Sequence, residues 1–162
     1  MSDVLDLIVI GSGPAGLSAA ARAQARNMRY ILLEKTDHLS DTIYKYQKGK
    51  HVMAEPGVLP LRSPMSFSAG SRESIIGAWD EELKKYNVNI RYGAQVTAIT
   101  GSKGSFTITL ANKSTVEAEA VILAIGLQGN LRKLGAPGED LPMVQYQLND
   151  PDEFSDETII VV

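Results

Sequence analysis

A glycine-rich turn between two apolar runs limits what the start of this chain can fold into. The run Val4–Ile10 is followed by Gly11, Gly13 and Gly16 in the spacing G-x-G-x-x-G, and a second apolar run ends at Glu34. The first run has the composition of a strand that is buried on both faces, and the alanine-rich stretch after it favours a helix. Strand, helix and strand within about 30 residues predict one βαβ unit.

Each residue type in the turn predicts a separate physical role. Gly11 permits the tight turn, Gly13 leaves room for the backbone to approach a pyrophosphate, and Gly16 lets the helix pack against the strand. Pro14 suits the first helical turn, where its missing N–H costs nothing, and the free N–H groups there attract an anion. Glu34, about 20 residues further on, can accept hydrogen bonds from ribose hydroxyls and disfavours a 2′-phosphate. The pattern predicts an adenine dinucleotide site, and by itself it fits NAD and FAD equally.

Composition excludes several other kinds of protein. The 162 residues, 44% hydrophobic and 22% charged, suit one ordinary globular domain. A net charge of −3 gives no support to binding of nucleic acid or of a membrane surface. The chain has no cysteine, and His38 and His51 lack the spacing of metal ligands, so we expect no metal site. It has no apolar run near 20 residues and no signal-peptide core, which favours a cytoplasmic protein.

Periodicity and turn signals predict the remaining elements. The sequences "GSKG" and "ANKS" separate three alternating runs and indicate a three-stranded meander. Trp79 falls on the apolar side of a predicted helix, where core packing is its expected role. We expect strands at 29–34, 87–93, 95–100, 105–110, 114–119 and 120–126, helices at 14–27 and 71–86, and irregular segments at 36–69 and 127–156. The final residues, "TIIVV", have the pattern of a buried strand, from which we expect a second domain to start there.

These motifs resemble those of the flavoproteins with two dinucleotide-binding domains, and most closely the thioredoxin-reductase-like group of the pyridine nucleotide-disulfide oxidoreductase family. "DLIVIGSGPAGLSAAARAQARNMRYILLEK" is similar to that group's FAD motif. "AEAVILAIG" resembles its second motif, with Ala124-Ile125-Gly126 carrying isoleucine in place of the usual threonine. "GAPGEDLPMV" is similar to the crossover segment, and "ETIIVV" resembles the first strand of the NADPH domain. "DTIYKY" and the crossover also resemble the bacillithiol-disulfide-reductase-like branch.

The resemblance implies an α/β fold. The expected fold is a Rossmann-like FAD-binding domain, with a parallel sheet, helices on both sides and a three-stranded antiparallel β-meander. It also implies three parts: residues 1–126 as the N-terminal portion of the FAD-binding domain, 127–157 as a crossover linker, and 158–162 as the first strand of an NAD(P)H-binding domain.

The resemblance also implies which residues hold the cofactor. The glycine turn would hold the pyrophosphate, Glu34 the ribose, and the backbone of Val96 the adenine, while Ala124-Ile125-Gly126 and Thr42 would lie near the isoalloxazine. The expected cofactor-binding residues are Gly11, Ser12, Gly13, Pro14, Ala15, Gly16, Glu34, Lys35, Thr42, Val96, Ala124, Ile125 and Gly126. Tyr44 and Tyr46 could stack on the ring, although packing or exposure is the favoured interpretation. No side chain of this chain is expected to be catalytic.

The implied function is that of an FAD-dependent pyridine nucleotide oxidoreductase. In such a protein NAD(P)H, bound in the second domain, reduces the bound FAD, which then reduces a disulfide, a ferredoxin or a low-molecular-weight oxidised thiol. The parent protein is expected to be a homodimer, and this portion alone to lack NADPH-dependent activity and to bind FAD weakly. Two alternatives stay open: an NAD-dependent dehydrogenase domain, and a non-catalytic module that binds a dinucleotide as a regulator.

Overall fold

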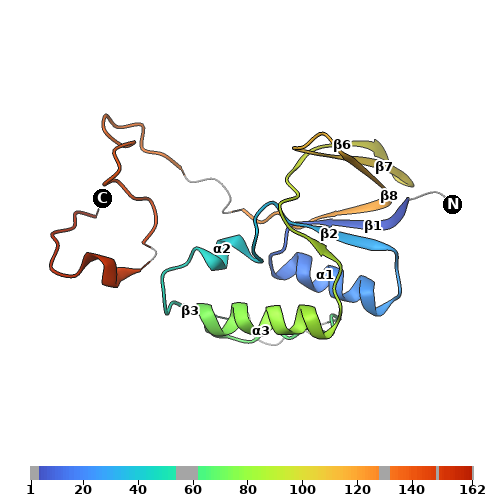
Figure 1. Ribbon diagram of the computed structural model, residues 1–162, viewed down its shortest axis with the longest axis horizontal. Coiled ribbons are helices and arrows are strands. Elements are labelled where there is room, and N and C mark those ends of the chain that lie inside the picture. Colours follow the sequence, from blue (N-terminus) through green and yellow to red (C-terminus); the bar gives the residue numbers. More distant parts are fainter. Residues whose placement is uncertain (1–3, 54–61, 128–131, 149, 162) are drawn as a thin grey trace.

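A six-stranded mixed sheet with helices packed beneath it forms the body of the molecule (Figure 1). The computed structural model describes residues 4–53, 62–127, 132–148 and 150–161. The strands are β1 (Leu5–Ile10), β2 (Tyr30–Leu33), β3 (His51–Val52), β4 (Gly70–Ser71), β5 (Ile90–Arg91), β6 (Val96–Ser102), β7 (Ser105–Leu110) and β8 (Thr115–Leu123). The helices are α1 (Pro14–Ala25), α2 (Asp41–Tyr44), α3 (Arg72–Lys85) and the 3₁₀ turn η1 (Pro151–Phe154). Most predicted elements are therefore confirmed, with ends that shift by a few residues.

The strand order is β5-β2-β1-β8-β7-β6. Strands β5, β2, β1 and β8 run parallel, while β6, β7 and β8 form the antiparallel meander. Strand β8 belongs to both parts, because its first residues pair with β7 and its later residues pair with β1. The sequence predicted two successive strands here, 114–119 and 120–126, and the structure joins them into one.

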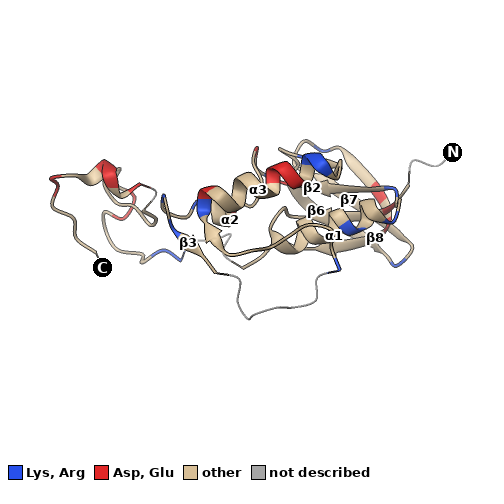
Figure 2. Cartoon of the chain, turned by 90° about the horizontal axis from the view of Figure 1, so that it is seen from below, with Lys and Arg blue, Asp and Glu red and all other residues tan. Residues whose placement is uncertain are grey.

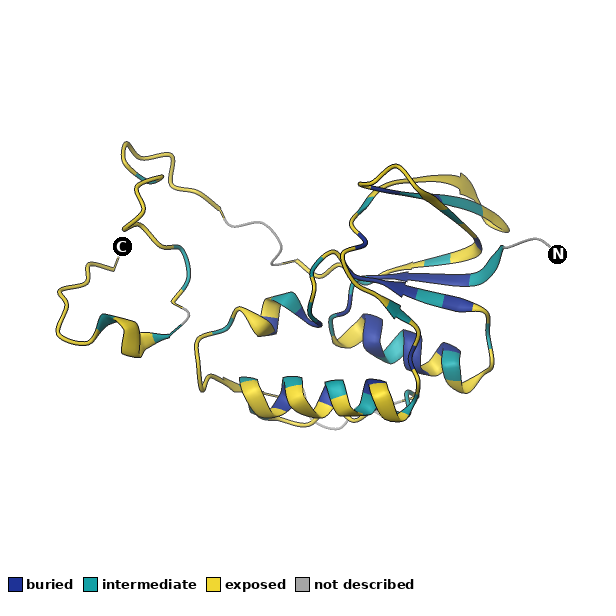
Figure 3. Cartoon of the chain, in the orientation of Figure 1, coloured by how far each residue is buried: buried dark blue, intermediate teal, exposed yellow. Residues whose placement is uncertain are grey.

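The two faces of the sheet are covered by different layers. Leu7 and Val9 of β1 pack with α1 and α3, whereas Ile8 and Ile10 pack with side chains of the meander. Alternate residues of a strand point to opposite faces, so one apolar run supplies both cores. The fold class is as predicted, but one detail differs: the helices α1, α2 and α3 lie on one side, and the meander covers the other (Figure 1, Figure 3). The meander curls over the sheet, so its own apolar side chains bury the face where we expected helices.

Helix α3 confirms the predicted core role of its aromatic residue. Ser71 caps the helix, because its Oγ accepts a hydrogen bond from the Ser74 N–H at 3.2 Å. Ile75, Trp79 and Leu83 are spaced by four residues and are all buried toward α1. The indole Nε1 of Trp79 also donates to the Ser66 carbonyl at 3.2 Å.

The described residues of the segment 36–69 are mostly irregular, as predicted. It contains the single turn of α2, and β3 pairs with β4 in a two-stranded ribbon. Residues 54–61 of this segment lie outside the described part of the chain. None of the described helices is both long and apolar enough to span a membrane.

The C-terminal segment, residues 132–148 and 150–161, consists of turns and the acidic η1 turn (Figure 2). It touches the body after α2, where Lys48 Nζ lies 3.2 Å from Asp150 Oδ2 and 3.3 Å from Asp152 Oδ2. Gln147 Nε2 also donates to the Lys45 carbonyl. The strand predicted at 158–162 is not formed in residues 158–161, which are exposed and pair with no described strand. A ladder requires a neighbouring strand, and no described residue provides one.

Candidate functional site

The glycines of the β1–α1 turn have the roles that their spacing predicts. Gly11 has φ of +99°, and a Cβ there would lie 2.6 Å from the Ala124 carbonyl oxygen. A Cβ on Gly16 would lie 1.8 Å from the Gly11 carbonyl oxygen, so only glycine lets α1 approach β1. A Cβ on Gly13 would meet no atom within 4 Å, which leaves open space beside the turn. Two glycines are therefore needed for packing, and the middle one faces a space that a ligand can fill.

The start of α1 offers unsatisfied donors to this space. The Gly11 N–H donates to the Leu33 carbonyl and the Ser12 N–H donates to Glu34 Oε2. Within the described part of the chain, the N–H groups of Gly13 and Ala15 donate to no protein atom. The helix has no side-chain cap and no acidic residue in its first turn. Free N–H groups at the positive end of a helix favour an anion such as a phosphate.

A cavity of about 980 Å³ lies at this turn, where β1, β2 and β8 end. The carboxyl ends of parallel strands are the usual ligand position in open α/β sheets. The structure brings the predicted cofactor residues together there: Gly11, Ser12, Gly13, Pro14, Ala15, Glu34, Lys35, Thr42, Val96, Ala124, Ile125 and Gly126 all line the cavity. Gly16, the remaining predicted residue, lies beneath the turn in the contact between α1 and β1.

Glu34 is a buried carboxylate that the protein already holds with hydrogen bonds. Its Oε2 accepts from the Ser12 N–H at 2.8 Å and from the Ser12 hydroxyl at 2.6 Å. Its Oε1 accepts from the Thr36 N–H at 3.0 Å and lies 3.1 Å from the Thr36 hydroxyl. Burial acts to raise the pKa of Glu34, but these hydrogen bonds outweigh it and lower the pKa below its ordinary value. The side chain is therefore a charged acceptor in the cavity wall.

The Thr36 hydroxyl can leave one oxygen of the Glu34 carboxylate available to accept a hydrogen bond from a ligand. It lies 3.1 Å from Glu34 Oε1 and also 2.8 Å from the carbonyl oxygen of His38. A hydroxyl has a single proton, so it can donate to only one of these two acceptors at a time. When it donates to His38, Oε1 has a lone pair free for another donor.

The closing strand supplies the opposite wall of the cavity. The Ala124 N–H continues the ladder by donating to the Ile10 carbonyl at 2.8 Å, and Gly126 then turns the chain with φ of +66°. Ile125, between them, is exposed. Val96 lies at the start of β6, so the meander also contributes to the wall.

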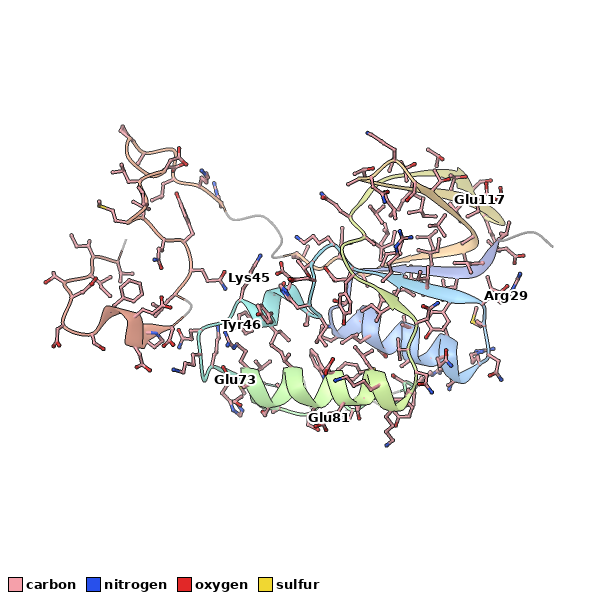
Figure 4. The ribbon with its side chains drawn as sticks, in the orientation of Figure 1. Arg29, Lys45, Tyr46, Glu73, Glu81 and Glu117 are labelled. Atoms are coloured by element: carbon pink, nitrogen blue, oxygen red, sulfur yellow. The ribbon has the colours of Figure 1, made fainter. Side chains whose placement is uncertain are left out.

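The aromatic residues near α2 separate into two environments. Tyr46 lines the cavity and is half-buried, with Lys50 Nζ 4.2 Å from its ring centroid. Tyr44 is exposed and stacks on His38 with 3.7 Å between ring centroids. Figure 4 shows Tyr46 and Lys45 at the end of α2. The favoured interpretation of packing or exposure describes both residues, because Tyr44 is exposed and Tyr46 packs against the core, although Tyr46 also lines the cavity.

The histidine beside Tyr44 lies in the loop before α2 and contacts two carboxylates. His38 Nδ1 lies 2.7 Å from Asp37 Oδ1 and its Nε2 lies 3.0 Å from Asp41 Oδ1. Asp41 also lies 3.0 Å from Lys45 Nζ and 3.9 Å from Lys35 Nζ. Among the residues that the structure describes, no group of histidines and carboxylates has the arrangement of a metal site.

Two neighbours of Thr42 that also line the cavity, Ser40 and Asp41, were not among the predicted site residues. Ser40 has a left-handed backbone, with φ of 53°, and its N–H donates to the Ser12 hydroxyl at 3.0 Å. A left-handed serine has no sequence signal, because this conformation is typical of glycine or asparagine. Only the dipeptide Ser40-Asp41 before a short helix could have indicated a turn at this position.

The comparison with known families fits this geometry. A family model described as pyridine nucleotide-disulphide oxidoreductase matches residues 8–162. The chain belongs to this family. Within it, the chain is of the thioredoxin-reductase-like flavoprotein type, as its similarity to several such reductases shows.

Individual relatives share the sequence and the fold. A ferredoxin–NADP reductase from Ignicoccus hospitalis is 29% identical over 157 residues, which are 97% of this chain and 48% of the relative. A bacillithiol disulfide reductase from Staphylococcus aureus has the same fold, with a TM-score of 0.75 and 23% identity over 93% of this chain and 47% of that structure. A ferredoxin-flavin thioredoxin reductase from Clostridium acetobutylicum is 30% identical, with a TM-score of 0.62 over 81% of this chain and 40% of that structure. The chain spans about half the length of the curated relatives it matches.

Proposed function

We propose that the chain is the FAD-binding portion of an NAD(P)H-dependent flavoprotein oxidoreductase. The observation that carries the proposal is the open turn: unsatisfied N–H groups at Gly13 and Ala15 face a cavity of about 980 Å³ with the carboxylate of Glu34 in its wall. A pyrophosphate accepts hydrogen bonds from such N–H groups, and a ribose donates to such a carboxylate. These are the two groups that an adenine dinucleotide presents side by side.

Each part of the cavity has a proposed partner in FAD. The turn Gly11–Gly16 would hold the pyrophosphate, and Oε1 of Glu34 would accept from a ribose hydroxyl when Thr36 turns to His38. Lys35 would lie beside the ribose, and the backbone at Val96 would pair with the adenine. The wall formed by Ala124, Ile125, Gly126 and Thr42 would flank the isoalloxazine. The flavin supplies the redox chemistry when bound, and these residues position it and shield it from water.

The relatives support a proposal for the electron donor and acceptor. We propose that NAD(P)H, bound by a second domain of the parent protein, provides the hydride. Relatives are named for ferredoxin and for bacillithiol disulfide, so we propose a ferredoxin, a disulfide or a low-molecular-weight oxidised thiol as acceptor. The chain contains no cysteine, so no redox disulfide is formed from its own residues.

A parallel titration with FAD and with NAD tests the proposal. We expect saturable FAD binding with perturbed flavin absorbance bands and a calorimetric signal, and no response to NAD. NAD binding without FAD binding would instead favour a dehydrogenase domain. Flavin that binds but that NADPH cannot reduce in the parent protein would favour a regulatory module. We also expect the chain by itself to show no NADPH-dependent turnover.

A matched pair of variants links binding to the turn. Gly13→Val places its Cβ in open space, with no protein atom within 4 Å, so it should abolish FAD binding and change the unfolding temperature little. Gly77→Val in α3 is the control, because a Cβ there also meets nothing within 4 Å but lies outside the cavity. Retention of FAD binding in Gly13→Val would contradict the proposed position of the pyrophosphate.

A further inference from the structure

One buried hydroxyl at the cavity has no hydrogen-bond partner among the residues that the structure describes. Ser40 is 2% exposed, and its Oγ donates to and accepts from no atom of the described residues. The same residue lines the cavity at the glycine turn. A buried polar group without a partner is destabilising, and such groups are rare in folded proteins. The presence of the Ser40 hydroxyl at this position therefore requires an explanation.

The fold does not need this hydroxyl. The backbone of Ser40 makes the structural contacts, since its N–H donates to the Ser12 hydroxyl at 3.0 Å and its carbonyl accepts from the N–H groups of Ile43 and Tyr44, both at 2.9 Å. Alanine would keep all three bonds with the same backbone. Glycine would be favoured by the left-handed φ of 53°. The backbone contacts and conformation therefore do not account for a serine here.

The surroundings indicate which kind of ligand atom the hydroxyl would meet. Ser40 is tied through the Ser12 hydroxyl to the turn whose N–H groups at Gly13 and Ala15 are free. Those groups are all donors, so the ligand atoms that they bind are acceptors. A serine hydroxyl is a donor that can rotate among three staggered positions. It can therefore add one more donor to the same set.

We propose that the hydroxyl of Ser40 donates a hydrogen bond to the pyrophosphate of the dinucleotide held by the glycine turn. This proposal rests on the proposed function, because it takes the same ligand. Ser12 gives the contact its position, since its hydroxyl accepts from Ser40 and donates to Glu34 at 2.6 Å. Ser12 therefore holds Glu34, which would bind the ribose, at a set distance from Ser40, which would bind the pyrophosphate.

Ser40→Ala is the variant that tests the proposal, because it removes only the unpartnered hydroxyl. Binding of FAD and of ADP, measured by calorimetry, should weaken about tenfold or more, since hydrogen bonds to charged groups are stronger than neutral ones. Binding of adenosine, which has no phosphate, should be unchanged. The unfolding temperature of the ligand-free chain should stay the same or rise, because a buried unmet group is lost.

Ser12→Ala is the matched control, since that hydroxyl has partners on both sides. It should lower the unfolding temperature of the ligand-free chain as well as the affinity for FAD. If wild-type protein binds FAD and Ser40→Ala binds FAD and ADP equally well, the role of Ser40 is wrong and the proposed function stands. If the wild type binds neither FAD nor ADP, both proposals fail. An equal loss of adenosine binding in Ser40→Ala would assign the hydroxyl to the nucleoside and overturn the pyrophosphate contact.

Discussion

Strand β1 and the segment 158–161 have nearly the same kind of sequence and opposite environments. "LIVI" in β1 is buried between two parallel neighbours, β2 and β8, with a core on each face. "TIIV" in the C-terminal segment pairs with no described strand, and Ile160 is 85% exposed. An apolar run rich in β-branched residues therefore has the capacity to form a strand, and whether it does so depends on the strands available beside it. The same difference predicts where substitutions will and will not destabilise the molecule.

The largest effect is expected where β1 and α1 make contact. Gly16→Ala would place a methyl group 1.8 Å from the Gly11 carbonyl oxygen, so α1 must move away from the sheet. We expect a loss of about 4 kcal/mol or more in the free energy of unfolding, or failure to fold. Gly77→Ala in α3 is the control and should stabilise by about 0.5–1 kcal/mol, because a Cβ there meets no neighbour. Urea unfolding of both variants measures the difference, and equal stabilities would contradict the close contact.

The same isoleucine-to-alanine substitution, made in β1 and in the segment 158–161, tests the difference between these two runs. Ile8 is 0% exposed, so Ile8→Ala should cost about 2–5 kcal/mol through lost burial and a cavity. Ile160→Ala should change the free energy of unfolding by less than about 0.5 kcal/mol, because its side chain is already in water. A large cost for Ile160→Ala would mean that the C-terminal run is packed in solution, and it would remove the distinction between the two regions.

A smaller and pH-dependent effect is expected at Glu34. Glu34→Gln replaces one acceptor oxygen by a donor that faces the groups of Ser12 or Thr36, which should cost about 2 kcal/mol near neutral pH. Since folding lowers the pKa of Glu34, its ionised form stabilises the protein above the ordinary glutamate pKa, and this stabilisation is lost as the pH falls through the lower, folded-state pKa. The difference between wild type and variant should therefore shrink below about pH 4.

Urea unfolding across this pH range gives the measurement for Glu34. The exposed Glu81, on the outer side of α3, offers the control, and Glu81→Gln should change the free energy of unfolding by less than about 0.5 kcal/mol. A constant difference between wild type and Glu34→Gln at every pH would mean that the carboxylate charge has no part in holding the turn.

The smallest effect is expected where the C-terminal segment touches the body. Lys48→Ala removes the ion pairs with Asp150 and Asp152, all of which lie at the surface. Exposed pairs contribute little to stability, so the unfolding midpoint should not change measurably. Amide hydrogen exchange in residues 150–154 should nevertheless become faster, while Lys103→Ala in the β6–β7 hairpin should leave it unchanged. Unchanged exchange in Lys48→Ala would show that the ion pairs do not hold the segment.

The central fold could be predicted because its signals are local. The G-x-G-x-x-G spacing, the helical spacing of Ile75, Trp79 and Leu83, and the two hairpin turns each lie within a short stretch. The predicted residues also meet at one cavity, since the ends of parallel strands share an edge of the sheet. Their contacts with FAD remain predictions.

The features that the sequence did not indicate depend on long-range contacts. The fusion of two predicted strands into β8 depends on which neighbours flank that strand, and the position of the meander over the sheet depends on its curvature. The absence of pairing in residues 158–161 likewise depends on the available neighbours. The left-handed turn at Ser40 is held by Ser12, which is 28 residues away in sequence. Propensity and periodicity contain no information about such partners.

The double pairing of β8 has a consequence for how this chain can change by insertion and deletion. One residue added inside β8 would invert the alternation of its side chains against either β7 or β1, because the two ladders use successive parts of the strand, and a shift against β1 would displace Ala124 from the turn at Gly11. Residues added at the tip between β6 and β7, around Lys103 and Gly104, would leave both ladders in register. Length variation should therefore be tolerated at the hairpin tip and not within β8, where one added residue would put the meander out of register with the parallel sheet.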